Sequence, residues 1–401
     1  MENLNAIQNP EPNPRWRVEK IYTDTDLFFE DILRAIGLAQ HWVRVEFYIF
    51  EKGELSERLF STFRQAIQRG VKIKLIIDGF GCSEWKAEDL RKLDGQNIQT
   101  RIYRPFPWIR KPSQPLSHFL KVHKFGRWFK YLNRRNHRKT VLIDEHALFS
   151  GSANLSSKHF KAHQGSRAWR DTGVYVEGAE IFKAIDAFEK AWLRAWNPDF
   201  QDTEHLLEDW SVLSIKASRK NLSSLIHLNY YSFLRLFYFY RLLRKIAKAQ
   251  NKIWITNAYF IPMGRLAHFL KKAKKRGVDI KILIPYKSDH KIAQWVSSLL
   301  MWRLARWGIE IYEYLPSILH AKTLIIDNFA MIGSSNLNYR SVRHDLEIDI
   351  AVQKAESLAL LEKQFLADLQ QSKKLSAHQR SFRRFLFSGL GKVFHFLKRW
   401  M

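Results

Sequence analysis

The chain has 401 residues, which allows two or three domains, and its 46% hydrophobic and 14% aromatic content is typical of a folded protein. The net charge of +27 calls for an anionic partner, either nucleic acid or an acidic lipid surface. The single cysteine, Cys82, excludes an internal disulfide, and residues 1–15 lack the apolar core of a signal peptide. No run of 18 residues is apolar and free of charge, so we expect no ordinary transmembrane helix.

The predicted helices and strands form two similar series. The first contains, in chain order, a helix and a strand within residues 27–50, an amphipathic helix at 55–66, a buried strand at 71–78, a short strand at 98–103, a strand at 171–176 and a helix at 181–196. The second repeats this order at residues 237–260, 266–273, 278–285, 309–312, 347–352 and 358–369. The amphipathic helices end near Gly70 and Gly277, as helices often do.

Strands that alternate with helices in this way indicate mixed β-sheets flanked by helices, so we predict an α/β protein of two similar halves. The predicted parts are a disordered polar N-terminus at 1–15, a first half at 16–200, a linker at 201–221, a second half at 222–370 and a tail at 371–401. Residues 222–240 are aromatic and apolar but contain His227 and Arg235. We therefore expect this segment to lie partly at a membrane interface instead of crossing the membrane.

A basic insertion and a basic tail distinguish the chain from a plain duplication. Thirty-three residues separate Tyr103 from His137, whereas seven separate Tyr312 from His320. The insertion, residues 105–136, holds eight Lys/Arg, seven aromatic residues and no acid, and the tail has Phe and Leu at near-helical spacing among further Lys/Arg. Such basic amphipathic segments are typical of proteins that dock on an anionic bilayer. Packing of the tail on its own protein, with the charges as a solvated face, is the alternative.

One motif occurs twice and carries the chemistry. It consists of a histidine, a lysine two residues later and an aspartate five residues after the lysine: His137, Lys139 and Asp144, then His320, Lys322 and Asp327. Residues two apart on a strand project from the same face, so each histidine lies beside its lysine. A titratable imidazole next to a fixed cation suits attack on a phosphate ester.

A small polar turn follows each copy of the motif, with Ser152 and Asn154 in the first half and Ser334 and Asn336 in the second. In each turn the two side chains, two positions apart, can point back toward the same pocket as hydrogen-bonding groups.

The connection to the second turn is one residue shorter, because five residues separate Asp327 from Gly333 where six separate Asp144 from Gly151. A slip of one residue would turn every side chain of the strand to the other face. Since residues 330–332 remain apolar, we expect the turn to absorb the deletion and the strand to keep its phase.

The duplicated His-x-Lys-x4-Asp pattern resembles the mark of the phospholipase D superfamily, and the resemblance covers residues 16–369. Within it the chain is most similar to bacterial cardiolipin synthases of the short type without N-terminal transmembrane helices. The resemblance implies two phospholipase D-like halves, each a mixed β-sheet flanked by helices, packed about a pseudo-twofold with one shared active site. It also implies a peripheral enzyme on the cytoplasmic side of the bacterial inner (cell) membrane.

The implied reaction is transfer of a phosphatidyl group to phosphatidylglycerol, from phosphatidylglycerol or phosphatidylethanolamine, through a phosphohistidine and without a cofactor. We assign His137 as nucleophile and His320 as acid/base, although the symmetric motif does not distinguish them. Lys139 and Lys322 would hold the phosphoryl oxygens, and the serines and asparagines of the turns would bind those oxygens or the lysines.

The acids and the remaining pocket residues are assigned by position. Asp144 and Asp327 belong to the motif, but their odd spacing from the histidines favours a structural role at the strand end. The resemblance implies that Glu347, eleven residues after Asn336, orients a histidine of the other half, and that Asp171 does so in the first half. Glu46 and Asn257, near the ends of matching strands, are further pocket candidates.

Metal binding is not predicted, because no cluster of histidines or carboxylates has the spacing of metal ligands. We expect four other histidines to be surface residues and not ligands: His118, His123, His159 and His163.

Four other functions compete with cardiolipin synthesis. A phospholipase D-type hydrolase or a phosphatidylserine synthase would share the framework. A nuclease of the superfamily fits the charge, but the Phe/Leu stripe of the tail and the two motifs in one chain favour a lipid substrate over nucleic acid. A membrane-binding scaffold with a decayed site is disfavoured, because both motif copies are complete.

Overall fold

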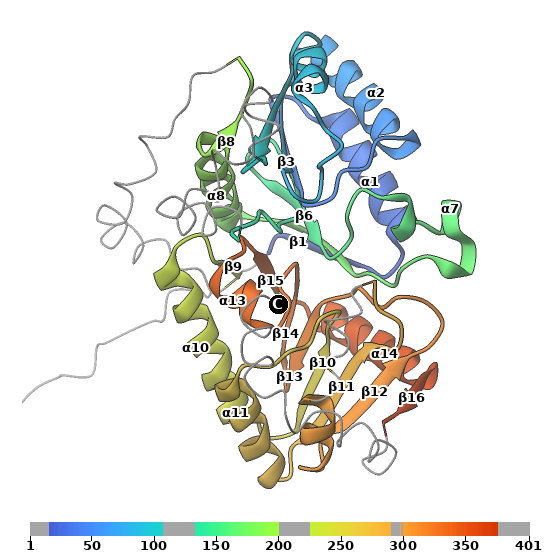
Figure 1. Ribbon diagram of the computed structural model, residues 1–401, viewed down its shortest axis with the longest axis vertical. Helices are drawn as coiled ribbons and strands as arrows, with labels where there is room; N and C mark the ends of the chain where they lie inside the picture. The colour runs from blue at the N-terminus through green and yellow to red at the C-terminus, as the bar shows by residue number, and fades with distance from the viewer. Residues whose placement is uncertain (1–15, 107–132, 200–224, 290–296, 298–299, 376–401) are drawn as a thin grey trace, which may run out of the picture.

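The computed structural model describes residues 16–106, 133–199, 225–289, 297 and 300–375. Residues 1–15, most of the basic insertion, the whole linker and most of the tail lie outside the described residues, and the expectations for them stay predictions. The two halves lie one above the other in Figure 1, the first in blue to green and the second in yellow to red.

The first half is an eight-stranded mixed sheet flanked by helices. Its main elements are β1 (Val18–Tyr22), α1 (Thr25–Leu38), β2 (Trp42–Phe47), α2 (Glu54–Gln68), β3 (Lys72–Asp78), α3 (Ala87–Asp94), β4 (Ile98–Tyr103), β5 (Thr140–Ile143), β6 (Ala147–Gly151), α7 (Lys161–Gln164), β7 (Gly173–Glu177), α8 (Phe182–Leu193) and β8 (Ala195–Trp196). The Asp24 carboxylate caps α1 by accepting hydrogen bonds from two backbone amides, and Gly70 follows α2 with φ +87°.

The second half repeats this plan. Its main elements are β9 (Ile226–Leu228), α10 (Ser232–Lys248), β10 (Lys252–Thr256), α11 (Gly264–Lys275), β11 (Asp279–Pro285), β12 (Glu310–Tyr314), β13 (Thr323–Ile326), β14 (Phe329–Gly333), α13 (Tyr339–Arg343), β15 (Ile348–Val352), α14 (Ala355–Gln370) and β16 (Ser372–Lys374). Gly277, after α11, has φ +93° and matches Gly70. The predicted α/β architecture is confirmed.

Both sheets have the same strand order, which shows that the duplication includes the whole fold. The orders are β1-β7-β6-β5-β2-β3-β4-β8 in the first half and, read from the matching end, β9-β15-β14-β13-β10-β11-β12-β16 in the second. The central strands β2 and β10 each pair with a parallel strand on one side and with the antiparallel motif strand on the other. Both strands are largely buried, and β2 carries the charged residues Arg44 and Glu46 between its apolar residues.

The shorter second turn leaves the strand phase unchanged, as predicted. Thr140 pairs with Ser150 on β6, and Thr323 pairs with Ile332 on β14, so the motif strand begins opposite the end of its neighbour in both halves. Ser152 follows β6 directly, and its amide donates to the carbonyl of Thr172. Ser334 follows β14 directly, and its amide donates in the same way to the carbonyl of Ile348.

The halves meet through one continuous apolar core. Leu148 and Val174 of the first half belong to the same buried cluster as Ile332 and Ile350 of the second. Trp16 strengthens the junction, because its indole N–H donates to the carbonyl of Ala351, 2.9 Å away, across the two halves. This packing brings strands β6 and β7 of the first sheet into contact with β14 and β15 of the second, and β6, β14 and β15 are labelled near the centre of Figure 1.

Two expectations require correction. The segment 222–240 contains β9, which pairs with β15, and Ile226 and Leu228 are buried in the protein, so an interfacial position for that strand is wrong. Farther along, Phe233 and Tyr240 of α10 are exposed. The second half also continues past residue 370, because β16 pairs with β12. Among the helices described, none has both the length and the hydropathy of a bilayer-spanning segment.

Candidate active site

The two motif histidines enter the molecule at the junction of the halves, in reciprocal positions. The amide of His137 donates to the carbonyl of Leu346 in the second half, and the amide of His320 donates to the carbonyl of Arg170 in the first. The N···O distance is 2.9 Å in both bonds. Both histidine residues are largely buried, at 9% and 4% exposure. Each histidine is therefore anchored by the opposite half, which brings both to one site.

Glu347 of the second half orients His137 of the first. Nδ1 of His137 lies 3.0 and 3.1 Å from the two carboxylate oxygens of Glu347. Ser334 and Ser341 donate their hydroxyls to the same carboxylate at 2.5 and 2.7 Å. Burial raises the pKa of Glu347 to about 7, although Lys139 and the two serines oppose the shift.

Asp171 of the first half orients His320 of the second. Oδ1 of Asp171 lies 2.8 Å from Nδ1 of His320 and accepts a 2.7 Å hydrogen bond from Ser152. Its other oxygen lies 2.7 Å from Nδ1 of His159. Burial acts to raise the pKa of Asp171, but the two imidazoles hold it well below its usual value. A carboxylate on Nδ1 leaves Nε2 of each catalytic imidazole for the chemistry.

The two lysines lie beside their histidines, as the motif predicts. Lys139 donates to the carbonyl of His137 at 2.6 Å, and Lys322 donates to the carbonyl of His320 at 2.7 Å while its Nζ lies 3.1 Å from Nε2 of the same residue. Burial, with the charge of Lys322, lowers the pKa of Lys139 to about 7, and burial lowers the pKa of Lys322 to about 8. These cations are partly desolvated and suited to an anionic ligand.

The imidazoles are neutral in this environment. Burial, followed by the nearby lysines, lowers the pKa of His137 well below its usual value, and burial and Lys322 lower that of His320 to about 3. A neutral imidazole has the lone pair that a nucleophile or a general base needs. An anionic phosphodiester between the two lysines would oppose this shift, because opposite charge favours the protonated form.

Three of the four serine and asparagine side chains of the turns bind other groups of the protein. Ser152 and Ser334 bind the carboxylates that orient the histidines. Asn154 accepts a hydrogen bond from the amide of Ile49 at 3.2 Å. The side-chain oxygen of Asn336 is buried without a hydrogen-bond partner in the described structure, which leaves it available to a ligand or to water. Direct binding of phosphate by the serines is therefore not what this arrangement favours.

Glu46 and Asn257 support the site without entering it. Glu46 lies 3.1 Å from the guanidinium of Arg138 and accepts hydrogen bonds from Thr140 and Asn136, which flank the first histidine. Asn257 binds the turn after β14, through the amide of Leu337 and the carbonyl of Ser335.

The motif aspartates lie at the far end of their strands. Asp144 accepts hydrogen bonds from the amides of Gln40, His41 and Trp42, and Asp327 does the same for the amides of residues 250–252. Their φ angles are +50° and +49°, in the left-handed region. Each aspartate therefore fixes the connection into the central strand, and neither carboxylate is placed to touch a substrate at the histidines.

The prediction that His159 is a surface residue is wrong. Its side chain is 1% exposed, bonds to Asp171 and packs 4.8 Å from the Trp169 ring and 5.1 Å from the His320 ring. His163 is exposed, as predicted. His118 and His123 lie outside the described residues.

Sequence reasoning also missed two tyrosines that line the site. The ring of Tyr48 lies 4.9 Å from that of His137, and the ring of Tyr259 lies 6.5 Å from that of His320. Each tyrosine comes two residues after Glu46 or Asn257, so alignment of the two halves could have found them.

One group of side chains has the composition of a metal site. Ligand atoms of His159, Asp171 and His320 all lie within 4.8 Å of one another. Both imidazoles, however, direct Nδ1 to the carboxylate at hydrogen-bonding distance, and this pairing accounts for the cluster without a metal ion.

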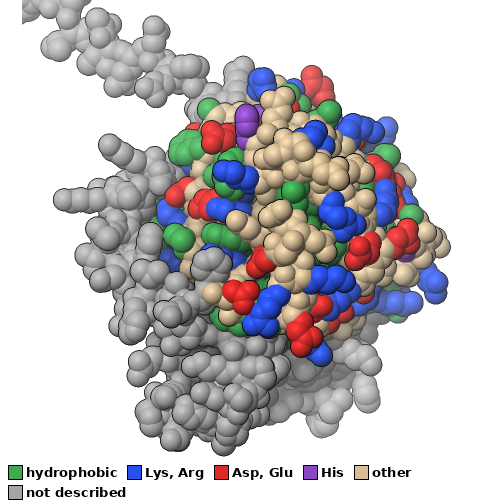
Figure 2. All heavy atoms as spheres, turned by 90° about the horizontal axis from the view of Figure 1, so that it is seen from above, with side chains coloured by type: hydrophobic (Ala, Val, Ile, Leu, Met, Phe, Trp, Pro, Cys, Tyr) green, Lys and Arg blue, Asp and Glu red, His purple; other side chains and the backbone are tan. Residues whose placement is uncertain are grey.

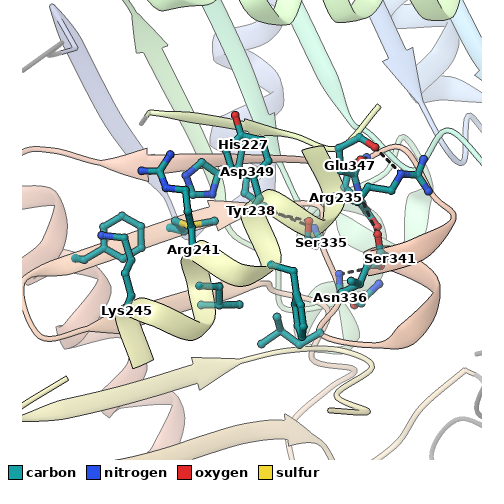
Figure 3. A pocket seen from close by; sticks show the side chains of 17 residues that line it. His227, Arg235, Tyr238, Arg241, Lys245, Ser335, Asn336, Ser341, Glu347 and Asp349 are labelled. Atoms are coloured by element: carbon teal, nitrogen blue, oxygen red, sulfur yellow. Dashed lines mark hydrogen bonds between the residues drawn. The ribbon is translucent and has the colours of Figure 1, made fainter. Parts of the chain in front are cut away.

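A small cavity lies behind Glu347, between α10 and strands of the second sheet. Figure 3 shows that Arg235, Tyr238 and Arg241 of α10 line it together with Glu347 and Asp349. Its volume of about 80 Å³ has room for a few water molecules but not for a lipid headgroup. We therefore regard this cavity as part of the surroundings that hold the Glu347 carboxylate in place.

Comparisons with known proteins agree with this geometry. A protein-family model described as "Cardiolipin synthase, PLD-like domain" matches residues 32–192 and 242–369, one segment in each half. The chain is 27% identical over 364 residues to "Probable cardiolipin synthase YwiE" of Bacillus subtilis, covering 89% of this chain and 67% of that protein. It is also 27% identical over 359 residues to a cardiolipin synthase of Clostridium perfringens, covering 87% of this chain and 70% of that protein.

Solved structures share the fold. A phosphatidylserine synthase of Haemophilus influenzae aligns with a TM-score of 0.68 at 13% identity, over 96% of this chain and 95% of that one. A polyphosphate kinase of Porphyromonas gingivalis aligns with a TM-score of 0.57 at 11% identity, over 95% of this chain and 55% of that one. From the family match over both halves and the paired histidines at their junction, we conclude that the chain belongs to the phospholipase D-like family of cardiolipin synthases, a family of phosphatidyltransferase enzymes.

Proposed function

We propose that this protein synthesises cardiolipin by moving a phosphatidyl group from phosphatidylglycerol, or from phosphatidylethanolamine, to a second phosphatidylglycerol. The observation that carries the proposal is the reciprocal pairing of His137 with Glu347 and of His320 with Asp171 across the halves. Two neutral imidazoles with fixed tautomers then share one phosphate-binding site with two lysines.

In the first step, Nε2 of His137 attacks the phosphorus of the donor lipid and the bond from phosphorus to the headgroup oxygen breaks. His320, protonated once the phosphodiester anion is bound, gives its proton to the departing alcohol. Lys139 and Lys322 offset the negative charge on the phosphoryl oxygens. The products of this half-reaction are a phosphatidyl-histidine and free glycerol or ethanolamine.

In the second step, a hydroxyl of the acceptor phosphatidylglycerol attacks the same phosphorus. His320, now neutral, takes the hydroxyl proton, and the bond between phosphorus and His137 breaks. The product is cardiolipin, and both histidines return to their starting state. Water in place of the acceptor would give phosphatidic acid, so the reaction depends on keeping water from the intermediate.

The charge distribution supports work at an acidic membrane surface. The insertion and the tail together hold 16 of the 66 Lys/Arg and none of the 39 acids. By contrast, the described surface in Figure 2 shows Lys/Arg interspersed with Asp/Glu. The excess positive charge is therefore concentrated in segments that also carry aromatic residues, which favours peripheral docking on anionic lipid. We propose the cytoplasmic face of the bacterial inner membrane as the site of action.

The test incubates the protein with vesicles that contain labelled phosphatidylglycerol, with and without phosphatidylethanolamine. We expect labelled cardiolipin from the wild type and none from His137→Ala or His320→Ala. His163→Ala is a matched control, because this exposed histidine should not affect turnover. Phosphatidic acid as the sole product would instead assign a hydrolase, and binding to DNA in preference to vesicles would favour a nuclease.

A further inference from the structure

The carboxylates that orient the two histidines are held differently in the two halves. Each accepts one hydrogen bond from the serine of its turn. Each also needs a donor for its second oxygen. In the second half this donor is the hydroxyl of Ser341, at 2.7 Å from Glu347, and in the first half it is Nδ1 of His159, at 2.7 Å from Asp171.

The two donors occupy matching positions in the duplicated sequence. His159 comes five residues after Asn154, and Ser341 comes five residues after Asn336. The acids differ in the opposite sense, because aspartate is one methylene shorter than glutamate and imidazole is longer than a hydroxymethyl group. The first half therefore pairs the longer donor, His159, with the shorter acid, Asp171. The second half pairs the shorter donor, Ser341, with the longer acid, Glu347, and the equivalent hydrogen bond forms in both halves.

The surroundings of His159 hold its ring in place. The ring is buried against Trp169, whose own ring lies 5.3 Å from that of His320. Nδ1 of both imidazoles faces Asp171, so each donates an N–H to a different carboxylate oxygen. Lys322, 3.1 Å from Nε2 of His320, donates to the lone pair that this tautomer leaves.

From this geometry we infer that His159 is a positioning residue, which holds Asp171 against His320 and keeps the carboxylate anionic so that His320 can accept and release a proton. Glu347, held by two neutral hydroxyls, lacks such a second imidazole. This difference assigns the proton transfers to His320 and leaves His137 as nucleophile. The inference rests on the proposed function, because it concerns the acid/base group of that reaction.

Four variants of the full chain test the pairing. His159→Ser removes the long donor, and we expect kcat to fall by about 10- to 100-fold, the loss of one hydrogen bond to a charged group. His159→Asn keeps a nitrogen donor near the position of Nδ1 and should recover most of kcat, whereas His159→Gln places its nitrogen farther out and should not. The double variant His159→Ser with Asp171→Glu rebuilds the second-half pair and should recover activity relative to His159→Ser.

The pH profile separates positioning from a structural role. Without the imidazole, Asp171 should protonate more easily, so the acidic limb of kcat/KM should move to higher pH in His159→Ser. It should stay there in the double variant, whose carboxylate would be held by two hydroxyls as Glu347 is. Turnover is scored as total headgroup release, whichever product forms. Unchanged kcat and an unchanged profile in His159→Ser would overturn the inference. So would a loss that neither the asparagine nor the double variant recovers while thermal unfolding stays normal.

A second measurement does not depend on turnover, so that a failure of the proposed function can be told apart. Protein labelled with ¹⁵N-histidine should show His320 with its proton on Nδ1 in the wild type, and this signal should change in His159→Ser and return in the double variant. An unchanged His320 signal in His159→Ser would contradict the inference. Wild type that makes no cardiolipin but shows the expected signals would overturn the proposed function alone.

Discussion

Asp171 of the first half lies 2.8 Å from Nδ1 of His320 in the second half, and Glu347 holds His137 in the reverse direction. Neither half alone contains a motif histidine together with the acid that orients it. The duplication therefore gives the chain two half-sites that function only at their junction, which is consistent with the continuous apolar core between them.

Removing the charge of either carboxylate should be severe. Glu347→Gln and Asp171→Asn keep the shape but can present the wrong hydrogen-bonding partner to Nδ1, and we expect kcat to fall by about 10³- to 10⁴-fold, as when the acid of a serine-protease triad is neutralised. Asp349→Asn is a matched control for Glu347→Gln, because Asp349 is a neighbouring buried acid whose pKa burial also raises to about 7. Its change should be less than about 10-fold. Equal losses at residues 347 and 349 would argue against a specific orienting role.

The activity should have a bell-shaped pH dependence. Because burial raises the pKa of Glu347 to about 7, the charged acceptor for His137 is present above that pH and is lost as the pH falls. Lys139 and Lys322 have pKa values lowered to about 7 and 8, so their positive charges are lost as the pH rises. We expect kcat/KM to decline on both sides of neutrality. In Lys139→Arg the alkaline limb should move to higher pH, because the charge with the lower pKa becomes permanent, and a profile that stays flat from pH 5 to 10 would contradict this account.

Asp144 should affect stability more than chemistry. Partial burial opposes ionisation, but hydrogen bonds from three backbone amides hold the pKa of Asp144 below its usual value, so its stabilising effect is present above the unfolded pKa and is lost as pH falls. We expect Asp144→Ala to lower the free energy of unfolding by about 1–3 kcal/mol.

Two further variants at residue 144 separate the loss of the hydrogen-bond acceptor from the strain of the left-handed backbone. Asp144→Asn tolerates the left-handed backbone and can still accept a hydrogen bond, so it should lose less stability than alanine. Asp144→Gly relieves the φ of +50° but loses the acceptor. Denaturant unfolding measures all three. A loss of catalysis in Asp144→Asn without any loss of stability would show that the carboxylate takes part in the reaction.

Arg138 and Glu46 form a buried ion pair beside the first motif strand, with side-chain exposures of 1% and 2%. Arg138→Met should destabilise the protein by about 3–5 kcal/mol, because it leaves a buried carboxylate without its cation. Adding Glu46→Gln removes that charge and should restore part of the stability. Denaturant unfolding of the single and double variants measures the coupling, and strictly additive losses would contradict a direct pair.

Membrane docking should depend on the basic tail. We expect the full chain to float with vesicles of phosphatidylglycerol, and less so with neutral vesicles or at high salt. Replacing Arg380, Arg383 and Arg384 by glutamate should weaken binding, with each basic residue contributing about 1 kcal/mol. The same change at three exposed lysines, Lys272 and Lys275 of α11 and Lys363 of α14, is a charge-matched control for the tail. Equal effects from both triple variants would indicate attraction without a preferred docking segment.

The main features of the fold and the histidine–lysine pairs could be predicted from the sequence because they occur twice. Duplication makes the spacing of His137 and Lys139 significant when it recurs at His320 and Lys322, and it aligns the strands of both halves. Short edge strands such as β1 and β9 were missed, because three to five residues carry little periodicity.

The support of the site was less predictable, because it depends on contacts distant in the chain. Ser152 was expected near phosphate or lysine, yet it donates to Asp171, nineteen residues away. His159 was missed because its counterpart, Ser341, is a different residue type, so the repeat gave no matching signal. The three amides that Asp144 binds belong to residues more than a hundred positions earlier.

A trapped covalent intermediate would test the central claim most directly. Phosphatidylglycerol with a radioactive phosphorus is incubated with the wild type, the reaction is quenched under conditions that preserve phosphohistidine, and the labelled peptide is mapped. We predict label on residue 137 in the wild type and none in His137→Ala. In His320→Ala, which lacks both the proton donor of the first step and the base of the second, the label should form more slowly and also be lost more slowly. Label on residue 320, or lipid product formed without a labelled histidine, would contradict the division of roles between the two halves.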